Sequence, residues 1–247
     1  MSILNILVRS TTRAEIFVDT FGRDVDLTNG RHLTKLFALP HLQAVIGGRG
    51  LAHTILSIGA VAAQAASLEA LCDGIPGAMA WANAERRKLP EGASPALDEQ
   101  EAGTSIALVA WDGSRVFCKL WNAYNSRDPA HSIVDLDKTR SRSYFGPGGD
   151  DPSLTVDSTS AGDAQMIALA RRQVAYVRER LGPDAPIGGR LIGATLDRGR
   201  ISMRTLADLE TTDVSREPAA QSVETIFTAA AVVPGLGGAV ASRYMTT

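Results

Sequence analysis

The sequence predicts an α+β fold, a four-layer αββα sandwich of two antiparallel sheets flanked by helices. Three pairs of apolar segments are joined by tight polar turns, which makes the paired strands antiparallel neighbours. The first segments are close to continuously apolar, which is typical of sheets covered on both faces. Segments with helical periodicity separate the strand groups. A doubly wound parallel sheet fits less well, because tight turns cannot join parallel strands.

A hairpin and two further strands are expected in the N-terminal part of the chain. Apolar residues fill both arms of the hairpin, and polar residues form the turn between them. Asn29-Gly30 marks a turn in the polar stretch that follows. Pro40 separates the two later strands, because it has no N–H to donate to a sheet. The strands predicted here are residues 3–8, 14–19, 32–39 and 42–47.

Helices are expected at three places before the C-terminal tail. In the first and third, apolar side chains recur at helical spacing, so that one face of the helix can pack on a sheet. Gly74 and Gly77 are expected to separate the first helix from the second. The predicted helices are residues 50–71, a segment after Gly77 that ends near Lys88, and residues 163–181.

The remaining strands form two more hairpins and a pair of short strands. Asp112-Gly113 and residues 197–199 supply the hairpin turns. The short strands precede the glycine-rich turn at residues 146–149. The strands predicted here are residues 104–111, 115–121, 133–136, 143–145, 190–196 and 201–206.

A single domain is expected over residues 1–206, followed by a linker and C-terminal tail over residues 207–247. A helix is expected near residues 220–231. Residues 225–242 carry no charge, although glycines and a proline interrupt them. An exposed weakly polar segment of this length usually finds a partner, so the tail is expected to contact a partner or an assembly.

Composition argues against several function classes. The formal net charge is −2, from 25 basic and 27 acidic residues, and no basic stripe indicates a nucleic-acid surface. The histidines are scattered without metal-ligand spacing, and Cys72 and Cys118 form no CxxC pair, so no metal or cofactor is expected. No segment has the pattern of a secretion signal or a membrane span. A cytoplasmic or particle-associated protein is therefore expected.

Asp19 and Lys35 are the most informative residues in the chain. They lie sixteen residues apart, Asp19 at the end of one predicted strand and Lys35 within the next, and a Lys-Leu-Phe run begins at Lys35. The following strand ends in Gly47, ahead of a glycine turn and a helix. This arrangement resembles the start of a proteasome-type (beta-subunit-like) subunit of the N-terminal-nucleophile (Ntn) hydrolase superfamily, and the resemblance extends over about residues 2–206.

The resemblance implies an N-terminal threonine or serine nucleophile whose own α-amino group acts as base. It assigns the acid to Asp19 and the lysine that lowers the pKa of the nucleophile to Lys35. It assigns the backbone N–H that stabilises the oxyanion to Gly47, and it makes Gly50 the second glycine of the turn. A second family acid falls to Asp184, before the paired glycines of the next segment.

The chain departs from the family at the nucleophile. The position sixteen residues before Asp19 is Ile3, which cannot attack a substrate. Ser2 can act only if the first hairpin is one residue longer than in the family and Met1 is removed. Two supporting serines of the family are also missing, one at the Gly146-Pro147-Gly148 turn and one at Ile187.

Two functions are therefore open. The departures favour a degenerate member, a non-catalytic structural subunit that builds a homo-oligomeric assembly or a larger particle such as a virion. The alternative is an active peptidase or amidase that uses Ser2 after Met1 removal. Asp19 and Lys35 can also be an ordinary ion pair between strand ends. The glycines near Arg49 can alternatively cradle a phosphate at a helix N-terminus.

Overall fold

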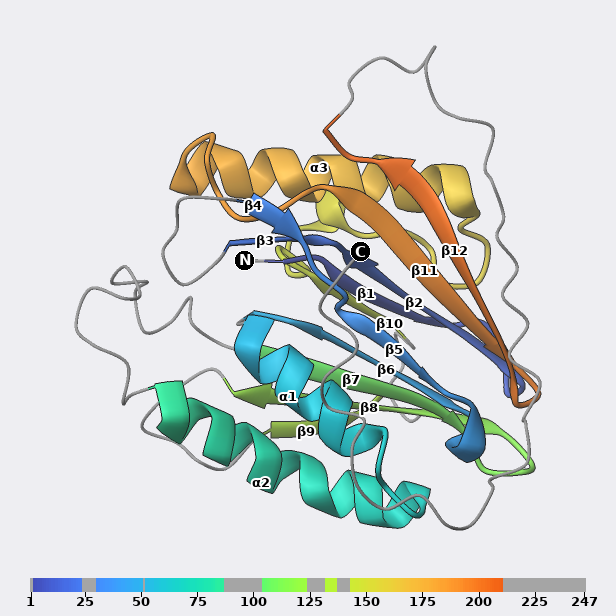
Figure 1. Cartoon of the computed structure of the whole chain (residues 1–247). Helices are drawn as coiled ribbons and strands as arrows, with labels where there is room; N and C mark the ends of the chain where they lie inside the picture. Colours follow the sequence, from blue (N-terminus) through green and yellow to red (C-terminus); the bar gives the residue numbers. More distant parts are fainter. Residues whose placement is uncertain are drawn as a thin grey trace.

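The computed structural model describes residues 2–23, 30–50, 52–86, 104–123, 132–136 and 143–210. Within these ranges the chain forms the predicted α+β sandwich, in which two stacked antiparallel sheets lie between layers of helices (Figure 1). In this part of the chain, no helix is long and apolar enough to cross a membrane.

The first sheet has the N-terminal hairpin near its centre. β1 lies between β10 and β2, and β2 pairs on its other side with β11 of the C-terminal hairpin. This central position buries both strands of the hairpin and explains their almost continuous apolar sequence. The strands in spatial order are β10 (Ser143–Gly146), β1 (Leu4–Val8), β2 (Arg13–Asp19), β11 (Arg190–Asp197) and β12 (Arg200–Asp208).

The second sheet, in the order β5-β6-β7-β8-β9, stacks on the first (Figure 1), and β3 and β4 form a separate two-stranded sheet. The strand expected over residues 32–39 is divided between β4 and β5. Between them, the Leu33 N–H bonds to the Thr20 carbonyl, which directs this stretch to the end of β2. The strands are β3 (Phe21–Arg23), β4 (Gly30–His32), β5 (Leu36–Leu39), β6 (Ala44–Arg49), β7 (Thr104–Trp111), β8 (Val116–Ala123) and β9 (Ser132–Asp135); single 3-10 turns occupy Pro40–Leu42 and Pro152–Leu154.

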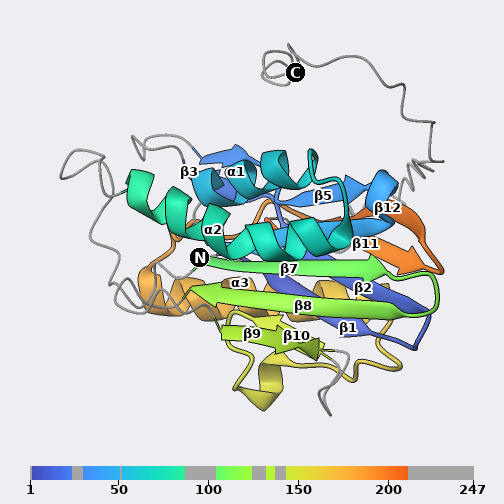
Figure 2. The same cartoon turned by 90° about the horizontal axis from the view of Figure 1, so that it is seen from below.

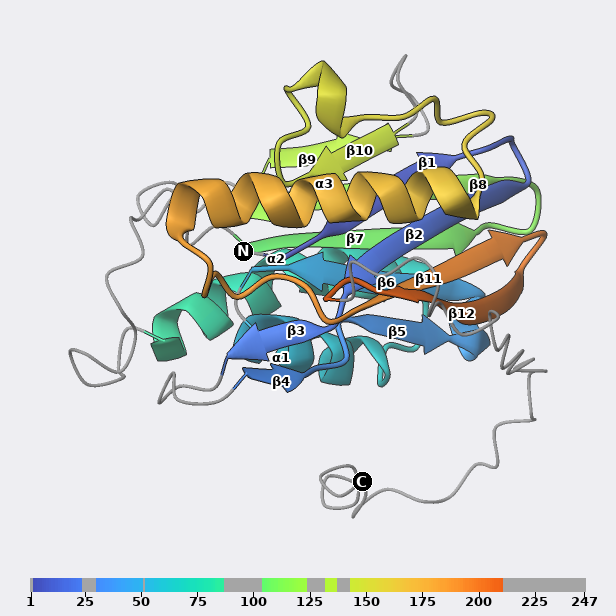
Figure 3. The ribbon, with the colours of Figure 1, turned by 90° about the horizontal axis from the view of Figure 1, so that it is seen from above.

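Helices cover the outer face of each sheet. α3 (Asp163–Leu181) lies over the first sheet (Figure 3), and α1 (Ala52–Ala62) and α2 (Leu68–Arg86) cover the second (Figure 2). Met166 of α3 packs in one core with Phe17 of β2, and Ile58 of α1 packs in another with Leu108 of β7. A third core lies between the sheets and includes Ile6, Ile16, Leu36, Val45, Val109 and Leu120.

The break between the first two helices is not where the sequence predicts it. α2 continues through Gly74, Pro76 and Gly77, and the break falls at residues 63–67. The Ser67 hydroxyl caps the new helix by accepting the Ala70 N–H at 3.1 Å. A helix-interior proline costs about 3 kcal/mol. Burial of three apolar side chains at about 1.5–3 kcal/mol each outweighs it, and these are Leu71, Ile75 and Met79.

The folded domain extends beyond the expected boundary at residue 206. β12 ends at Asp208, Leu209 is buried, and the Leu209 N–H bonds to the Gly189 carbonyl at 2.7 Å. The expected tail helix near 220–231 and the uncharged segment 225–242 lie outside the described residues, as does the turn residue Asn29.

Candidate functional site

Asp19 and Lys35 meet in the interior, at one end of the sandwich. Asp19 is the last residue of β2, and Lys35 directly precedes β5. The Lys35 ammonium lies 2.9 Å from Asp19 Oδ1, and the two side chains are only 2% and 0% exposed. The resemblance therefore points to two residues that the fold does bring together.

The Asp19 carboxylate accepts hydrogen bonds from three other segments of the chain. Its Oδ1 accepts the Ile3 N–H at 2.9 Å as well as the Lys35 ammonium, and its Oδ2 accepts the Gly188 N–H at 3.0 Å. A buried charge is tolerated only when it is paired and hydrogen-bonded, and Asp19 meets both conditions. These contacts hold the carboxylate in one orientation.

Lys35 has a hydrogen-bond partner for each of its three ammonium protons. It donates to Asp19, to the Phe21 carbonyl and to Ser2 Oγ, the last at 2.9 Å. Burial lowers the pKa of the Lys35 ammonium below its ordinary value, and the neighbouring Asp19 carboxylate opposes that shift. The result is a rigid ammonium in direct contact with a serine hydroxyl.

Ser2, and not Ile3, occupies the position beside the lysine. The β1–β2 register pairs Leu4 with Val18, so that Ile3 stands opposite Asp19. The Ile3 side chain is buried in the core under α3. Side chains alternate between the faces of a strand, and the Ser2 hydroxyl accordingly reaches Lys35. Ser2, one residue before the position that the family spacing gives, therefore lies where its hydroxyl can contact Lys35.

The strand before the glycine turn continues to Arg49, beyond its expected end at Gly47. Gly47 lies inside β6, in register with Leu36 of β5 and Ala107 of β7. The next N–H, of Gly48, bonds to the Lys35 carbonyl at 3.0 Å, so the Gly47 N–H faces β7 on the opposite side of the strand. The turn follows β6 at Gly50, whose φ of 109° favours glycine.

Asp184 is exposed on the turn after α3, unlike the buried cluster of Ser2, Asp19 and Lys35. The paired glycines that follow it do reach the site, because Gly188 donates its N–H to Asp19. Ile187, at the position where the resemblance implies a serine, is buried in the core under α3.

The sequence reasoning missed two groups of polar contacts, one within the cluster and one under α3 on the other face of β1. The Phe21 carbonyl and the Gly188 N–H are backbone groups, which leave no signature in a sequence. Asn5 and Gln173 form a reciprocal amide pair at 2.9 and 3.0 Å, with both side chains fully buried. The sequence does carry a signal for this pair, because Asn5 lies within an apolar run and Gln173 lies on the apolar face of a helix.

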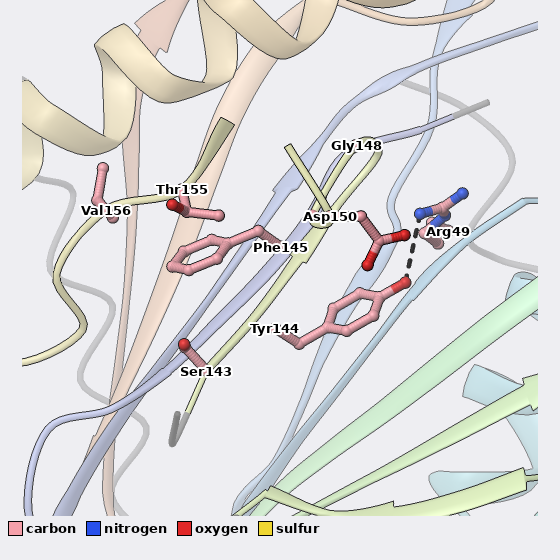
Figure 4. Close-up of a pocket in the computed structure, with 9 residues that line it drawn as sticks. Arg49, Ser143, Tyr144, Phe145, Gly148, Asp150, Thr155 and Val156 are labelled. Carbon is pink, nitrogen blue, oxygen red and sulfur yellow. Dashed lines mark hydrogen bonds between the residues drawn. The ribbon is translucent and has the colours of Figure 1, made fainter. Parts of the chain in front are cut away.

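A pocket of about 570 Å³ opens where β6 and β10 come together. The Arg49 guanidinium enters it from the end of β6 and donates to the Tyr144 hydroxyl of β10 at 3.3 Å (Figure 4). The guanidinium also lies against Gly146. Among the described residues, no group of His, Cys, Asp and Glu side chains could hold a metal ion. The pocket is lined by Arg49, Ser143, Tyr144, Phe145, Gly148, Gly149, Asp150, Thr155 and Val156.

No protein-family model matches the chain, and no curated protein matches it. Among solved structures, the chain is similar to a Gly-1 mutant of Anbu from Hyphomicrobium sp. strain MC1, with a TM-score of 0.55 and 10% identity over 83% of this chain and 87% of that one. It is also similar to Anbu (ancestral beta-subunit) from Yersinia bercovieri, with a TM-score of 0.54 and 11% identity over 83% and 86%.

Proposed function

Taking the proteasome-type Ntn hydrolase fold that these likenesses show as the premise, we propose that the chain is a serine-type Ntn hydrolase that cleaves peptide or amide bonds. One observation carries this proposal. The Ser2 hydroxyl lies 2.9 Å from the Lys35 ammonium, inside a buried cluster that Asp19 completes. Removal of Met1 gives Ser2 a free α-amine, so that nucleophile and base belong to one residue.

The chemistry needs only groups of this chain and a water molecule. The α-amine accepts the proton of Ser2 Oγ while the oxygen attacks the substrate carbonyl carbon. The Lys35 cation stabilises the developing alkoxide, and a backbone N–H stabilises the oxyanion, a role that the resemblance assigns to Gly47 with Gly50 as the second turn glycine. The amine then donates the proton to the leaving nitrogen as the C–N bond breaks. Water hydrolyses the resulting Ser2 ester and regenerates the hydroxyl.

The energetic cost of the cluster supports a chemical role. A buried ion pair is often no better for stability than apolar residues of similar volume, and replacing one can stabilise a protein by about 1–4 kcal/mol. Lys35 and Asp19 are both buried, and Ser2 adds a third polar group. A subunit that only builds an assembly has no need of such a cluster.

Intact mass and covalent labelling test the proposal. We expect Met1 to be absent from the purified protein, and an electrophile aimed at N-terminal nucleophiles to add once, at Ser2. Ser2→Ala should abolish the labelling, and Lys35→Ala should reduce it. Thr12→Ala, in the β1–β2 turn, is the matched control and should label like the wild type. A chain that keeps Met1 and resists labelling would refute hydrolysis by Ser2.

The second candidate function is a non-catalytic structural subunit of a homo-oligomer or a larger particle such as a virion. Ile187 favours it, because an apolar side chain stands where the family has a supporting serine. Retained Met1 together with a stable oligomer of unlabelled chains would support this function. Asp184 remains a proposed participant only in the hydrolytic function.

A further inference from the structure

The Gly188–Gly189 turn, between α3 and β11, contacts the candidate site through both peptide groups of Gly188. The Gly188 N–H donates to Asp19 Oδ2 at 3.0 Å. The Gly188 carbonyl accepts the Phe21 N–H at 3.1 Å, and the Phe21 carbonyl in turn accepts a proton of the Lys35 ammonium. The orientation of this turn therefore affects both members of the buried ion pair.

A pair of glycines does not fix the orientation of the peptide group between them. Gly188 and Gly189 have φ angles of 129° and 72°, and glycine occupies this region without the steric cost that other residues meet. The preceding side chain, Ile187, has no hydroxyl with which to hold the turn. Groups from other segments must therefore keep the Gly188 N–H directed at Asp19.

Glu210, just past the end of β12, restrains this turn. Its Oε1 accepts the Gly189 N–H at 3.0 Å, and the neighbouring Leu209 N–H donates to the Gly189 carbonyl at 2.7 Å. Glu210 thus holds the N–H end of the glycine–glycine peptide, and Phe21 holds its carbonyl end. A Cβ at Gly188 would collide with Glu210 Oε1, so the close approach of this carboxylate accounts for a glycine at that position.

Arg178, in the last turn of α3, holds the Glu210 carboxylate against the turn. Its Nη2 donates to both carboxylate oxygens at 2.8 Å and to the Ile187 carbonyl at 3.3 Å. The two charged side chains are 32% and 44% exposed, so the pair by itself adds little stability. Its effect is geometric, because it joins α3 and the end of β12 to the segment that contacts Asp19.

We propose that Glu210 is a positioning residue of the hydrolase, which keeps the glycine–glycine peptide in the orientation that aligns Asp19 with Lys35. This inference rests on the proposed hydrolytic function, because the alignment affects a rate only if Ser2 attacks. Glu210 acts through the turn and not on the substrate. Its loss should therefore slow the chemical step and leave substrate binding unchanged.

A β-lactone that acylates Ser2 measures the chemical step. The Ser2 oxygen forms an ester with the lactone carbonyl carbon, the ring C–O bond breaks, and the hydroxyl proton passes through the α-amine to the released alkoxide. Saturation kinetics separate the maximal rate of acylation, kinact, from the half-saturating concentration, KI. We expect Glu210→Ala to lower kinact about tenfold at unchanged KI, as the loss of one hydrogen bond to a charged group implies.

Two further variants make the test specific. Glu210→Gln retains an oxygen for the Gly189 N–H, so its kinact should stay within about threefold of the wild type, because the exposed ion pair contributes little. Glu179→Ala removes an exposed glutamate next to Arg178 in α3 and is the matched control, which should react like the wild type. If Glu210→Ala melts early, Glu210→Met, which retains the side-chain length without an oxygen, takes its place.

Hydrogen exchange of the Gly188 amide, followed by NMR, reports on the turn independently of activity. Exchange should accelerate about tenfold in Glu210→Ala, because the N–H loses its fixed orientation toward Asp19. It should be unchanged in Glu179→Ala.

The outcomes separate this inference from the proposed function. A wild-type kinact in Glu210→Ala overturns the positioning role and leaves the hydrolase intact. A loss that Glu210→Gln shares in full also overturns it, since the charge and not the Gly189 acceptor would then matter, as does an effect on KI alone. A wild-type protein that resists the lactone refutes the hydrolase. Exchange at Gly188 then decides whether Glu210 holds the turn, and unchanged exchange in Glu210→Ala shows that it does not.

Discussion

Lys35 is the residue on which the candidate site depends. Its ammonium is buried and donates to a serine hydroxyl, a carboxylate and a backbone carbonyl that come from different segments. Because Asp19 also accepts two backbone N–H groups, loss of Lys35 leaves a buried carboxylate without its counter-charge. Stability and chemistry therefore depend on the same side chain.

Replacing Lys35 by alanine is expected to lower the free energy of unfolding by about 3–5 kcal/mol, because the Asp19 charge stays buried and unpaired. Chemical denaturation measures the change. Arg115→Ala is the control, since the Arg115–Asp112 pair is largely exposed and such pairs contribute about 0–1 kcal/mol. Equal and small losses in the two variants would show that the Lys35 pair is hydrated in solution.

The pH dependence of kcat/KM should report the two proton positions of the site. Activity is expected to rise as the Ser2 α-amine loses its proton, at about pH 8. It should fall again where Lys35 loses its charge, below the ordinary value of 10.5, because burial lowers the Lys35 pKa. A pH–rate profile on the processed enzyme measures both limbs. An activity that is constant from neutral to strongly alkaline pH would contradict these roles.

At the scale of elements, the β1–β2 register decides which side chain meets Lys35, and the Ser67 cap supports the start of α2. The β1–β2 register directs the Ile3 side chain under α3 and leaves the Ser2 hydroxyl for Lys35. In the α1–α2 layer, the Ser67 cap and the buried Leu71 and Ile75 maintain a helix that its proline and glycines would otherwise interrupt.

Ser67→Ala is expected to lower stability by about 1 kcal/mol, because the Ala70 N–H loses its capping acceptor. Ser67→Asn, which retains a side-chain oxygen at the cap, should stay close to the wild type. Denaturant unfolding compares the three proteins. If alanine and asparagine behave alike, the cap contributes nothing and packing alone starts α2.

At the scale of the whole molecule, the α1–α2 layer presents large apolar side chains to solvent. Leu56 and Val61 of α1 are 41% and 47% exposed, and Trp81 of α2 is 54% exposed. Exposed apolar surface of this kind marks interaction sites. This layer is therefore the face that we expect to mediate a homo-oligomer.

Trp81→Lys is expected to shift the protein toward the monomer, because a charge in an apolar contact must be desolvated. Light scattering measures the mass at several concentrations. Leu181→Lys is the control on the opposite helix layer, where the side chain is 37% exposed, and it should leave the mass unchanged. A wild-type protein that is monomeric at every concentration would refute the assembly.

The sequence by itself determined the elements whose signals are local. α3 follows from its apolar stripe, and the two later hairpins follow from their turn residues. Asp19 and Lys35 are indicated by the resemblance of the first fifty residues to a proteasome-type subunit. Only the tertiary structure decided that Ser2 rather than Ile3 meets Lys35, and that Arg49 enters a pocket with Tyr144. These outcomes depend on strand register and on contacts between segments far apart in the chain, which local periodicity does not encode.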